Sequence, residues 1–182
     1  MEFTVRNVVE SDLEKIMNWR MSPEVTTYMN TNPKLTMEKQ RKWFEALKNQ
    51  DIAKYFWIIE VGGKPAGVLF LENIDFKKKN TSWAYYIGEK SLRSMELAIS
   101  LELSIYEYVF ERMEFEEIHS EVFSVNAGVV KLHQLCGCRI EKIVKEKVHK
   151  EGKKYDVTYL TLTKKEWEEK KGKYKYQKID FG

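Results

Sequence analysis

The sequence is poor in the residues that often place a protein in a class at first sight. Its 182 residues include two cysteines, three prolines and nine glycines. Cys136 and Cys138 are separated by one residue, so a disulfide between them would be strained, and we expect two small buried thiols. His133 completes an H-x-x-C-x-C spacing, but a structural zinc site commonly uses two separated ligand pairs, and no second pair exists. We therefore expect no metal.

Long apolar runs and a charge excess of one sign are absent as well. No stretch approaches the roughly 20 apolar residues that cross a bilayer. The opening MEFTVRNVVESD lacks the basic-then-apolar layout of a signal peptide, so we expect a cytoplasmic protein without a membrane partner. The net charge of +3, from 31 Lys and Arg against 28 Asp and Glu, is too balanced for nucleic-acid binding.

The length suits one domain, residues 1–182, with its core in 3–167 and a basic C-terminal tail in 168–182. There is no internal repeat, linker or low-complexity segment. The stretch 164–178, KKEWEEKKGKYKYQK, mixes both charge signs and ends in alternating Lys and Tyr. This pattern predicts a frayed tail or an edge strand.

Hydrophobic periodicity predicts strands and helices in a mixed order. The strands are expected at 3–9, 55–61, 66–75, 81–88, 117–125, 139–150 and 154–163, and the helices at 10–21, 36–50, 92–113 and 126–137. Ser11 and Glu14 match a capping box for the first helix, and Thr36 and Asn126 are candidate caps for two others. The order predicts one α+β domain in which helices pack on a mostly antiparallel sheet.

Glycine is missing where a phosphate site would ordinarily use it. The segment SLRSMELAIS, residues 91–100, joins a predicted strand to a long predicted helix. Such junctions present backbone N–H groups to phosphates, and glycine usually lets the ligand come close. Here Ser94 and Glu96 occupy the turn, so the turn alone is consistent with either a plain helix start or a modified phosphate site.

The order of elements, together with SWAYYIG, SLRSMELAISLELSIYEYVFERM, EVFSVNAGVVKLHQLCGCRIE and YDVTYLTLTKKEW, resembles the GCN5-related N-acetyltransferase (GNAT) superfamily over roughly residues 3–167. The resemblance implies the GNAT fold, with helices on both faces of a central mixed sheet. It also implies direct acetyl transfer from acetyl-CoA in a ternary complex. The two glycine positions of the family's pyrophosphate turn fall on Ser94 and Glu96. The implied acetyl-CoA-binding residues are Tyr85, Tyr86, Ile87, Arg93, Ser94, Met95, Glu96, Leu97, Ala98 and Asn126.

Acetyl transfer requires a neutral amine, hydrogen-bond donors for the developing oxyanion and an acid for the departing thiolate. The resemblance implies that His133 is the acid, at a position where the family often has tyrosine. Glu72 and Glu121 lie on predicted strands and are candidate bases acting through water, although an exposed amine would need no protein base. A role-free imidazole at position 133 is the alternative.

The acceptor amine is expected to bind at the first two helices and their loop. The run NWR…EV…YM…T…EKQRKWFEAL is similar to the nucleotide-sugar N-acetyltransferases of pseudaminic acid biosynthesis. That similarity implies acetylation of UDP-4-amino-4,6-dideoxy-N-acetyl-β-L-altrosamine on its 4-amino group. Its implied binding residues are Arg20, Tyr28, Met29 and Asn30.

Other interpretations stay open at this point. The acceptor could be a ribosomal-protein N-terminus or a polyamine, although 22–34 is not an acidic segment that would receive a polycation. The missing glycines could instead mark a non-catalytic GNAT-like interaction domain that pairs through its Lys/Tyr tail. A homodimer is possible.

Overall fold

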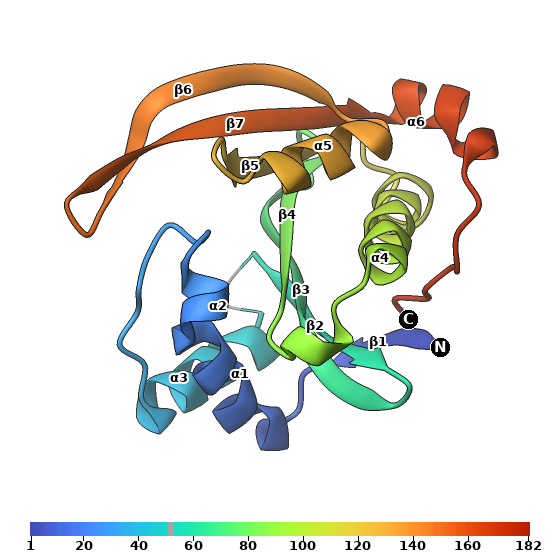
Figure 1. Ribbon diagram of the computed structural model, residues 1–182. Helices are drawn as coiled ribbons and strands as arrows, with labels where there is room; N and C mark the ends of the chain where they lie inside the picture. Colours follow the sequence, from blue (N-terminus) through green and yellow to red (C-terminus); the bar gives the residue numbers. More distant parts are fainter. Residues whose placement is uncertain (51–52) are drawn as a thin grey trace.

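A seven-stranded sheet forms the centre of the protein, in a computed structural model that describes residues 1–50 and 53–182 (Figure 1). In space the strands follow the order β1-β2-β3-β4-β5-β7-β6, and every neighbouring pair is antiparallel except β4 and β5, which are parallel. The strands are β1 (Phe3–Asn7), β2 (Tyr55–Val61), β3 (Lys64–Asp75), β4 (Asn80–Ile87), β5 (Glu117–Phe123), β6 (Arg139–Lys150) and β7 (Lys153–Thr163).

Helices cover both faces of the sheet, as expected for the GNAT fold. The helices α1 and α3 lie on one face, whereas α4 and α5 lie on the other (Figure 1). They are α1 (Leu13–Met21), α2 (Pro23–Thr26), α3 (Met37–Lys48), α4 (Met95–Glu107), α5 (Ala127–Leu135) and α6 (Lys164–Lys170). The predicted fold class is confirmed, and the predicted elements occur in the expected order, with α2 and α6 in addition. The helix α4 continues into a π-helical turn over Tyr108–Arg112.

The strands β4 and β5 separate after a short paired stretch. They pair only from Asn80 with Glu117 to Ser82 with His119. Beyond that point β4 keeps β3 as its neighbour on one side, while its other edge has no strand partner within the described residues. The sheet therefore opens into a wedge between the second halves of β4 and β5.

Side chains along β4 alternate between the two faces of the sheet, as in any strand. Trp83, Tyr85 and Ile87 belong with the core on the α4 side, and Ala84 and Tyr86 with the core on the α1 and α3 side. The helix α3 packs against the second core through the predicted Met37, Trp43, Phe44 and Leu47. The edge of β4 is therefore flanked by an apolar layer on each face.

The predicted capping box at the first helix is wrong. The helix α1 begins at Leu13, with Asp12 in the cap position, and Ser11 makes no cap hydrogen bond. The Asp12 carboxylate instead accepts from the Val9 N–H at 2.9 Å and from the Arg6 guanidinium at 2.7 Å. Asp12, three residues after Val9, therefore ties the end of β1 to the start of α1 in place of the predicted Ser11 cap.

The C-terminal tail is neither frayed nor an edge strand. Thr163 caps α6 by accepting the Glu166 N–H, and the chain beyond α6 packs back onto the core. Ile179 and Phe181 are 6% and 7% exposed. The Phe181 ring lies 5.1 Å from the ring of Trp57, centroid to centroid. The mixed-sign composition of the tail concealed these two apolar anchors.

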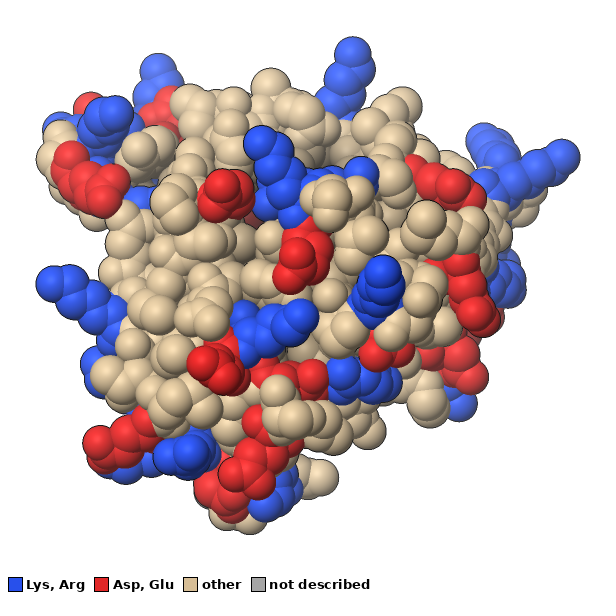
Figure 2. Space-filling view, turned by 60° about the horizontal axis from the view of Figure 1, so that its bottom comes forward, with Lys and Arg blue, Asp and Glu red and all other residues tan. Residues whose placement is uncertain are grey.

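The charge distribution on the surface and the state of the two cysteines match the expectations from the sequence. Lys and Arg alternate with Asp and Glu over the face seen in Figure 2, without a large field of one sign. Cys136 and Cys138 are both buried and free, as predicted. Among the helices of residues 1–50 and 53–182, none combines the length and apolarity needed to cross a membrane.

Candidate active site

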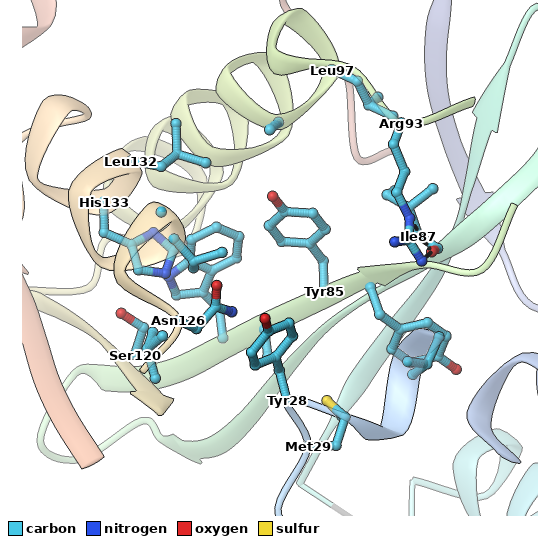
Figure 3. Close-up of a pocket in the computed structure, with 18 of the residues that line it drawn as sticks. Tyr28, Met29, Tyr85, Ile87, Arg93, Leu97, Ser120, Asn126, Leu132 and His133 are labelled. Atoms are coloured by element: carbon cyan, nitrogen blue, oxygen red, sulfur yellow. Dashed lines mark hydrogen bonds between the residues drawn. The ribbon is translucent and has the colours of Figure 1, made fainter. Parts of the chain in front are cut away.

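A cleft of about 590 Å³ occupies the wedge between β4 and β5 and is closed by α4 and α5. Figure 3 shows side chains from all four elements converging on it. Most of the residues implied by the resemblance line this cleft: Tyr85, Tyr86, Ile87, Arg93, Ser94, Met95, Leu97, Ala98, Asn126 and His133. Glu96 is the exception, because it is exposed at the start of α4 and lies outside the lining.

The free edge of β4 forms one wall of the cleft. In an antiparallel ladder alternate residues direct their N–H and C=O groups toward the neighbouring strand, so the others face away from it. Between Trp83 and Ile87 those outward groups face the opening where β5 has separated. Apart from the Ile87 carbonyl, which accepts from Arg93, they are available to hydrogen-bond an extended ligand. Burial raises the pKa of both Tyr85 and Tyr86, so the hydroxyls of these two residues, on opposite faces of β4, stay neutral near pH 7.

The start of α4 has free N–H groups despite its lack of glycine. The Ser94 hydroxyl accepts from the Leu97 N–H at 3.1 Å, and the Ser94 carbonyl accepts from the Ala98 N–H. The N–H groups of Ser94, Met95 and Glu96 have no acceptor within the part of the chain that the structure describes. Within the segment predicted to bind pyrophosphate, residues 93–98, the free N–H groups therefore belong to Ser94, Met95 and Glu96.

The backbone of this turn does not need glycine. No residue from Lys90 to Ala98 has a positive φ, and Ser94 is extended, with φ −149° and ψ 156°. The turn is anchored by the Arg93 guanidinium, which donates two hydrogen bonds to the Ile87 carbonyl, at 2.8 and 3.1 Å (Figure 3). Arg93 therefore fixes the end of β4 to the start of α4.

His133 lies at the inner end of the cleft and is 4% exposed. Its Nδ1 is 2.7 Å from an oxygen of Glu102, and its ring packs 5.4 Å from the ring of Trp83. Glu102 is completely buried on α4 and was missed from sequence. The available signal was a lone carboxylate inside AISLELSIY, the most apolar stretch of α4.

Two polar side chains on and after β5 complete this end of the cleft. Asn126 occupies the cap position of α5, but its side chain makes no cap hydrogen bond, contrary to the expected cap role, and it lines the cleft (Figure 3). Ser120 is 4% exposed, and its hydroxyl has no hydrogen-bond partner among the described residues. Ser120 was not predicted. Both residues line the cleft, and neither side chain has a hydrogen-bond partner among the described residues.

A second cavity, of about 430 Å³, lies beside the first and extends over the opposite face of β4. All four predicted acceptor residues line it, namely Arg20, Tyr28, Met29 and Asn30. Tyr28, Met29, Tyr86 and Glu121 line both cavities, so the two adjoin at β4. We call the second cavity the acceptor cavity. Trp19, by contrast, is a core residue, 6% exposed, whose indole N–H donates to Glu89.

The two candidate bases occupy different environments. Glu72 forms an ion pair with Lys54 at 3.1 Å within the acceptor cavity and does not reach the cleft. Glu121 is exposed on β5, lines both cavities and has no ion-pair partner among the described residues. Of the two, Glu121 has the better position for an amine that enters between the cavities.

Arg20 brings a half-buried cation to the acceptor cavity. Its guanidinium donates to the carbonyl and hydroxyl oxygens of Thr31, at 3.3 and 3.1 Å, and forms no ion pair within the described part of the chain. Burial lowers the pKa of Arg20, opposed by the nearby Tyr86. Arginine still stays protonated in proteins, so the cavity contains a positive charge without a carboxylate partner.

The loop that carries Tyr28 and Met29 is held by hydrogen bonds from a lysine at the end of β6. Lys150, at the end of β6, is 9% exposed and donates to the carbonyl oxygens of Thr26 and Met29. The second of these hydrogen bonds is 3.0 Å long. No sequence pattern pointed to Lys150, because its partners lie more than a hundred residues earlier in the chain.

Comparisons with known proteins agree with this geometry. A family model described as "Acetyltransferase (GNAT) domain" matches residues 5–159. The chain is 23% identical over 129 residues to the SPbeta prophage-derived uncharacterized N-acetyltransferase YokL of Bacillus subtilis, covering 70% of this chain and 71% of that protein.

Solved structures resemble the fold closely. A spermidine N-acetyltransferase from Vibrio cholerae in complex with CoA and spermine superposes with a TM-score of 0.84 at 19% identity, covering 91% of this chain and 97% of that one. A structure described as a probable acetyltransferase gives a TM-score of 0.79 at 17% identity, with 90% and 93% covered. At such identities the likeness establishes the fold. With the family match over most of the chain, the protein belongs to the GNAT family and is an acetyl-CoA-dependent N-acetyltransferase.

Proposed function

We propose that the enzyme acetylates the amino group of a nucleotide-linked amino sugar. The sequence resemblance names UDP-4-amino-4,6-dideoxy-N-acetyl-β-L-altrosamine as the expected acceptor. The observation that carries the proposal is the charge arrangement of the acceptor cavity. Arg20 offers a cation without a carboxylate partner among the described residues, and Glu121 offers a carboxylate at the junction with the cleft.

These two charges suit an acceptor that is anionic at one end and bears an amine at the other. Guanidinium groups bind phosphate oxygens through paired donors, so Arg20 is suited to a diphosphate. Glu121 is suited to the amine. The remaining pair, Lys54 and Glu72, neutralises itself. The charged side chains of the lining therefore sum to zero.

The apolar part of the lining favours a flat or ring-shaped acceptor. Trp43, Phe56, Phe70, Tyr28 and Tyr86 contribute aromatic surface to the acceptor cavity. Aromatic faces bind sugar and base rings through their apolar and π surfaces. A nucleotide sugar provides both kinds of ring.

A polyamine is the second candidate, since the similar Vibrio cholerae structures are of spermidine N-acetyltransferases. A polycation is bound best where carboxylates outnumber cations. In the acceptor cavity Arg20 and Lys54 balance Glu72 and Glu121, so a polyamine would meet as much repulsion as attraction. The charge balance thus favours the nucleotide sugar.

The cleft fits acetyl-CoA by its polar groups. The free N–H groups at the start of α4 suit the pyrophosphate, because a helix N-terminus attracts anions whatever its side chains. The free edge of β4 and the unpartnered Ser120 hydroxyl suit the amide-rich pantetheine arm. The cleft volume of about 590 Å³ lies within the usual range for ligand sites. Acetyl-CoA supplies the acetyl group as a thioester.

Residues where the cleft meets the acceptor cavity supply a base, hydrogen-bond donors and an acid for direct transfer of the acetyl group to the amine. Glu121 accepts the proton that the amine nitrogen loses, directly or through water. Outward N–H groups of β4, near Tyr86 and Ile87, donate to the acetyl oxygen as negative charge develops there. His133 donates a proton to the sulfur as the carbon–sulfur bond breaks. Because the two cavities adjoin, no acetylated enzyme is required.

A thiol-release assay with a panel of amines tests the acceptor. The panel contains the UDP-linked 4-amino sugar, spermidine and a peptide with a free N-terminus. We expect the largest kcat/KM with the UDP-linked sugar. Activity confined to spermidine or to the peptide would refute the proposed acceptor.

The variant Arg20→Met tests the phosphate contact within the same assay. Loss of a guanidinium–phosphate interaction, worth about 1.5–3 kcal/mol, should raise the KM for the UDP-linked sugar at least tenfold. The KM for acetyl-CoA should stay constant, because Arg20 does not line the cleft. Lys42→Met, an exposed cation on α3 outside both cavities, is the matched control.

A further inference from the structure

A buried carboxylate stands behind the proposed acid. Glu102 is 0% exposed, and one of its oxygens, Oε1, lies 2.7 Å from His133 Nδ1 and also accepts the Tyr106 hydroxyl at 2.5 Å. Its second oxygen, Oε2, has no hydrogen-bond partner within the described residues. A carboxylate is rarely buried so completely unless it is paired. We therefore ask what the contact between Glu102 and His133 does for the reaction.

Within residues 1–50 and 53–182, no other cation makes a hydrogen bond to Glu102. The ionisable groups around Glu102 are Tyr106 on α4, Tyr85 on β4, Cys136 and Cys138 after α5, and Tyr174 in the C-terminal segment. From α6, Lys170 and Glu166 face Cys138; Lys170 donates to the Gly137 carbonyl at 2.7 Å, and neither contacts Glu102. Burial, reinforced by Glu102, raises the pKa of both thiols and of these tyrosine hydroxyls. These thiols and hydroxyls are therefore neutral near pH 7. Among the described residues, His133 is the one hydrogen-bonded partner of Glu102 that can carry a positive charge.

Because an unbalanced buried charge is costly, the pair is stable in a form with zero net charge. Two arrangements meet this condition. In one, an imidazolium faces a carboxylate; in the other, a neutral imidazole accepts at Nδ1 from a carboxylic acid. In both arrangements the second ring nitrogen of His133, Nε2, carries a hydrogen, since Nδ1 is engaged with Glu102.

We propose that Glu102 is a positioning residue that keeps a hydrogen on Nε2 of His133 and so maintains this histidine as the acid of the reaction. The proposal rests on acetyl transfer from acetyl-CoA, and not on which amine is the acceptor.

The proton balance of the step is complete. The amine nitrogen forms a bond to the acetyl carbon, and the carbon–sulfur bond breaks with its electrons going to sulfur. Sulfur takes the hydrogen from His133 Nε2, while the proton of the amine goes to Glu121 or water. The pair then carries one negative charge, which is unfavourable in this site, so it regains a proton from solvent after the products leave.

Histidine nitrogen NMR tests the proposal without any acceptor. The protein has three histidines, so the signal of His133 can be assigned with His133→Gln. At pH 7.5 we expect a protonated Nε2 in the wild-type protein. In Glu102→Gln the amide oxygen accepts from Nδ1, so the neutral ring should carry its hydrogen there and leave Nε2 bare. A bare Nε2 in the wild-type protein would overturn the proposal.

Turnover provides the second test, with whichever amine of the panel is acetylated fastest. General acids contribute roughly 10²–10⁴-fold, so we expect Glu102→Gln to lower kcat at least tenfold at pH 8.5. At pH 6 the higher proton concentration favours a hydrogen on both ring nitrogens, so the loss should be several-fold smaller. The KM for acetyl-CoA should change less than threefold. An equal loss of kcat at both pH values would indicate a merely structural role and refute the proposal.

Two further variants distinguish loss of the Glu102–His133 interaction from general damage to the core. Ser100→Ala is the control for a substitution at a buried polar position of α4, and it should keep the wild-type pH profile. In a His133→Phe background, Glu102→Gln should lower kcat no further, because the acid is already gone. An additive loss in the double variant would contradict the proposal. Failure of the nucleotide-sugar assignment would appear separately, in the amine panel.

Discussion

The variant Met95→Pro removes one backbone N–H group from the proposed pyrophosphate site and leaves the helix intact. Met95 is the first residue of α4, and proline is well tolerated at this position because the lost N–H has no partner within the helix. The preceding Ser94 is already extended, as proline requires of its neighbour. The Met95 side chain is 65% exposed, so little packing is lost.

The expected effect follows from the hydrogen bond that is removed. A hydrogen bond to a charged group contributes about 1.5–3 kcal/mol, which corresponds to a roughly 10- to 150-fold weaker affinity. We therefore expect Met95→Pro to raise the dissociation constant of acetyl-CoA at least tenfold. Isothermal titration calorimetry with acetyl-CoA measures this directly. Met95→Ala removes the same side chain and keeps the N–H, so the tenfold difference is measured between Met95→Pro and Met95→Ala, which isolates the loss of the N–H group.

Two results would refute the reasoning behind this prediction. Equal affinity in Met95→Pro and Met95→Ala would mean that the start of α4 does not hold the pyrophosphate. Absence of any acetyl-CoA-induced rise in melting temperature in the wild-type protein would be a broader failure, since a ligand that binds the native state must stabilise it. Melting curves without ligand show whether proline itself disturbs the fold.

Three other predictions test the remaining structural arguments. Lys150→Met should raise the amine KM about tenfold by releasing two carbonyls of the acceptor loop, in steady-state kinetics with the exposed Lys147→Met as control. Phe181→Ala should cost about 3 kcal/mol and lower the melting temperature by roughly 6–12 °C; an unchanged value would mean that the tail is not docked. Burial alone would raise the pKa of Asp12, but the hydrogen bonds from Arg6 and Val9 outweigh it and lower the pKa below 3.8. The ionised Asp12 carboxylate should therefore stabilise the folded protein fully above about pH 4 and progressively less below it. Acid unfolding measures this contribution, which should be absent in Asp12→Asn.

Local patterns in the sequence were sufficient for the main helices and strands and for the fold class, whereas the outline of the cleft came from the family resemblance. Alternation in 81–88 identified β4, and the apolar spacing of 92–113 identified α4, because both depend only on neighbours along the chain. The resemblance then aligned a turn, an asparagine and a histidine that lie together in the cleft. Where the local pattern was ambiguous, at 164–178, the prediction was wrong, since burial of Ile179 and Phe181 depends on a distant surface.

The missed parts of the site share one physical cause, which is that their partners are far apart in the sequence. His133 meets Glu102 across 31 positions, and Lys150 meets Met29 across 121. No periodicity or motif encodes such pairs. What the sequence does offer is an anomaly, as with Glu102, the one carboxylate in AISLELSIY, the most apolar stretch of α4. A buried charge must be balanced by something, so an anomaly of this kind predicts that a partner exists without identifying it.

The backbone conformation explains why the turn before α4 can lack glycine. Glycine is required where φ is positive or where a Cβ would obstruct the ligand. Neither Ser94 nor its neighbours from Lys90 to Ala98 have positive φ, so the backbone path itself imposes no such requirement. The anion-binding property belongs to the free N–H groups and the dipole of α4, which any side chain leaves in place. The serine adds a cap by accepting from the Leu97 N–H, and the Glu96 side chain lies outside the lining of the cleft. A motif search that insists on glycine would therefore reject a turn that still offers its anion-binding groups.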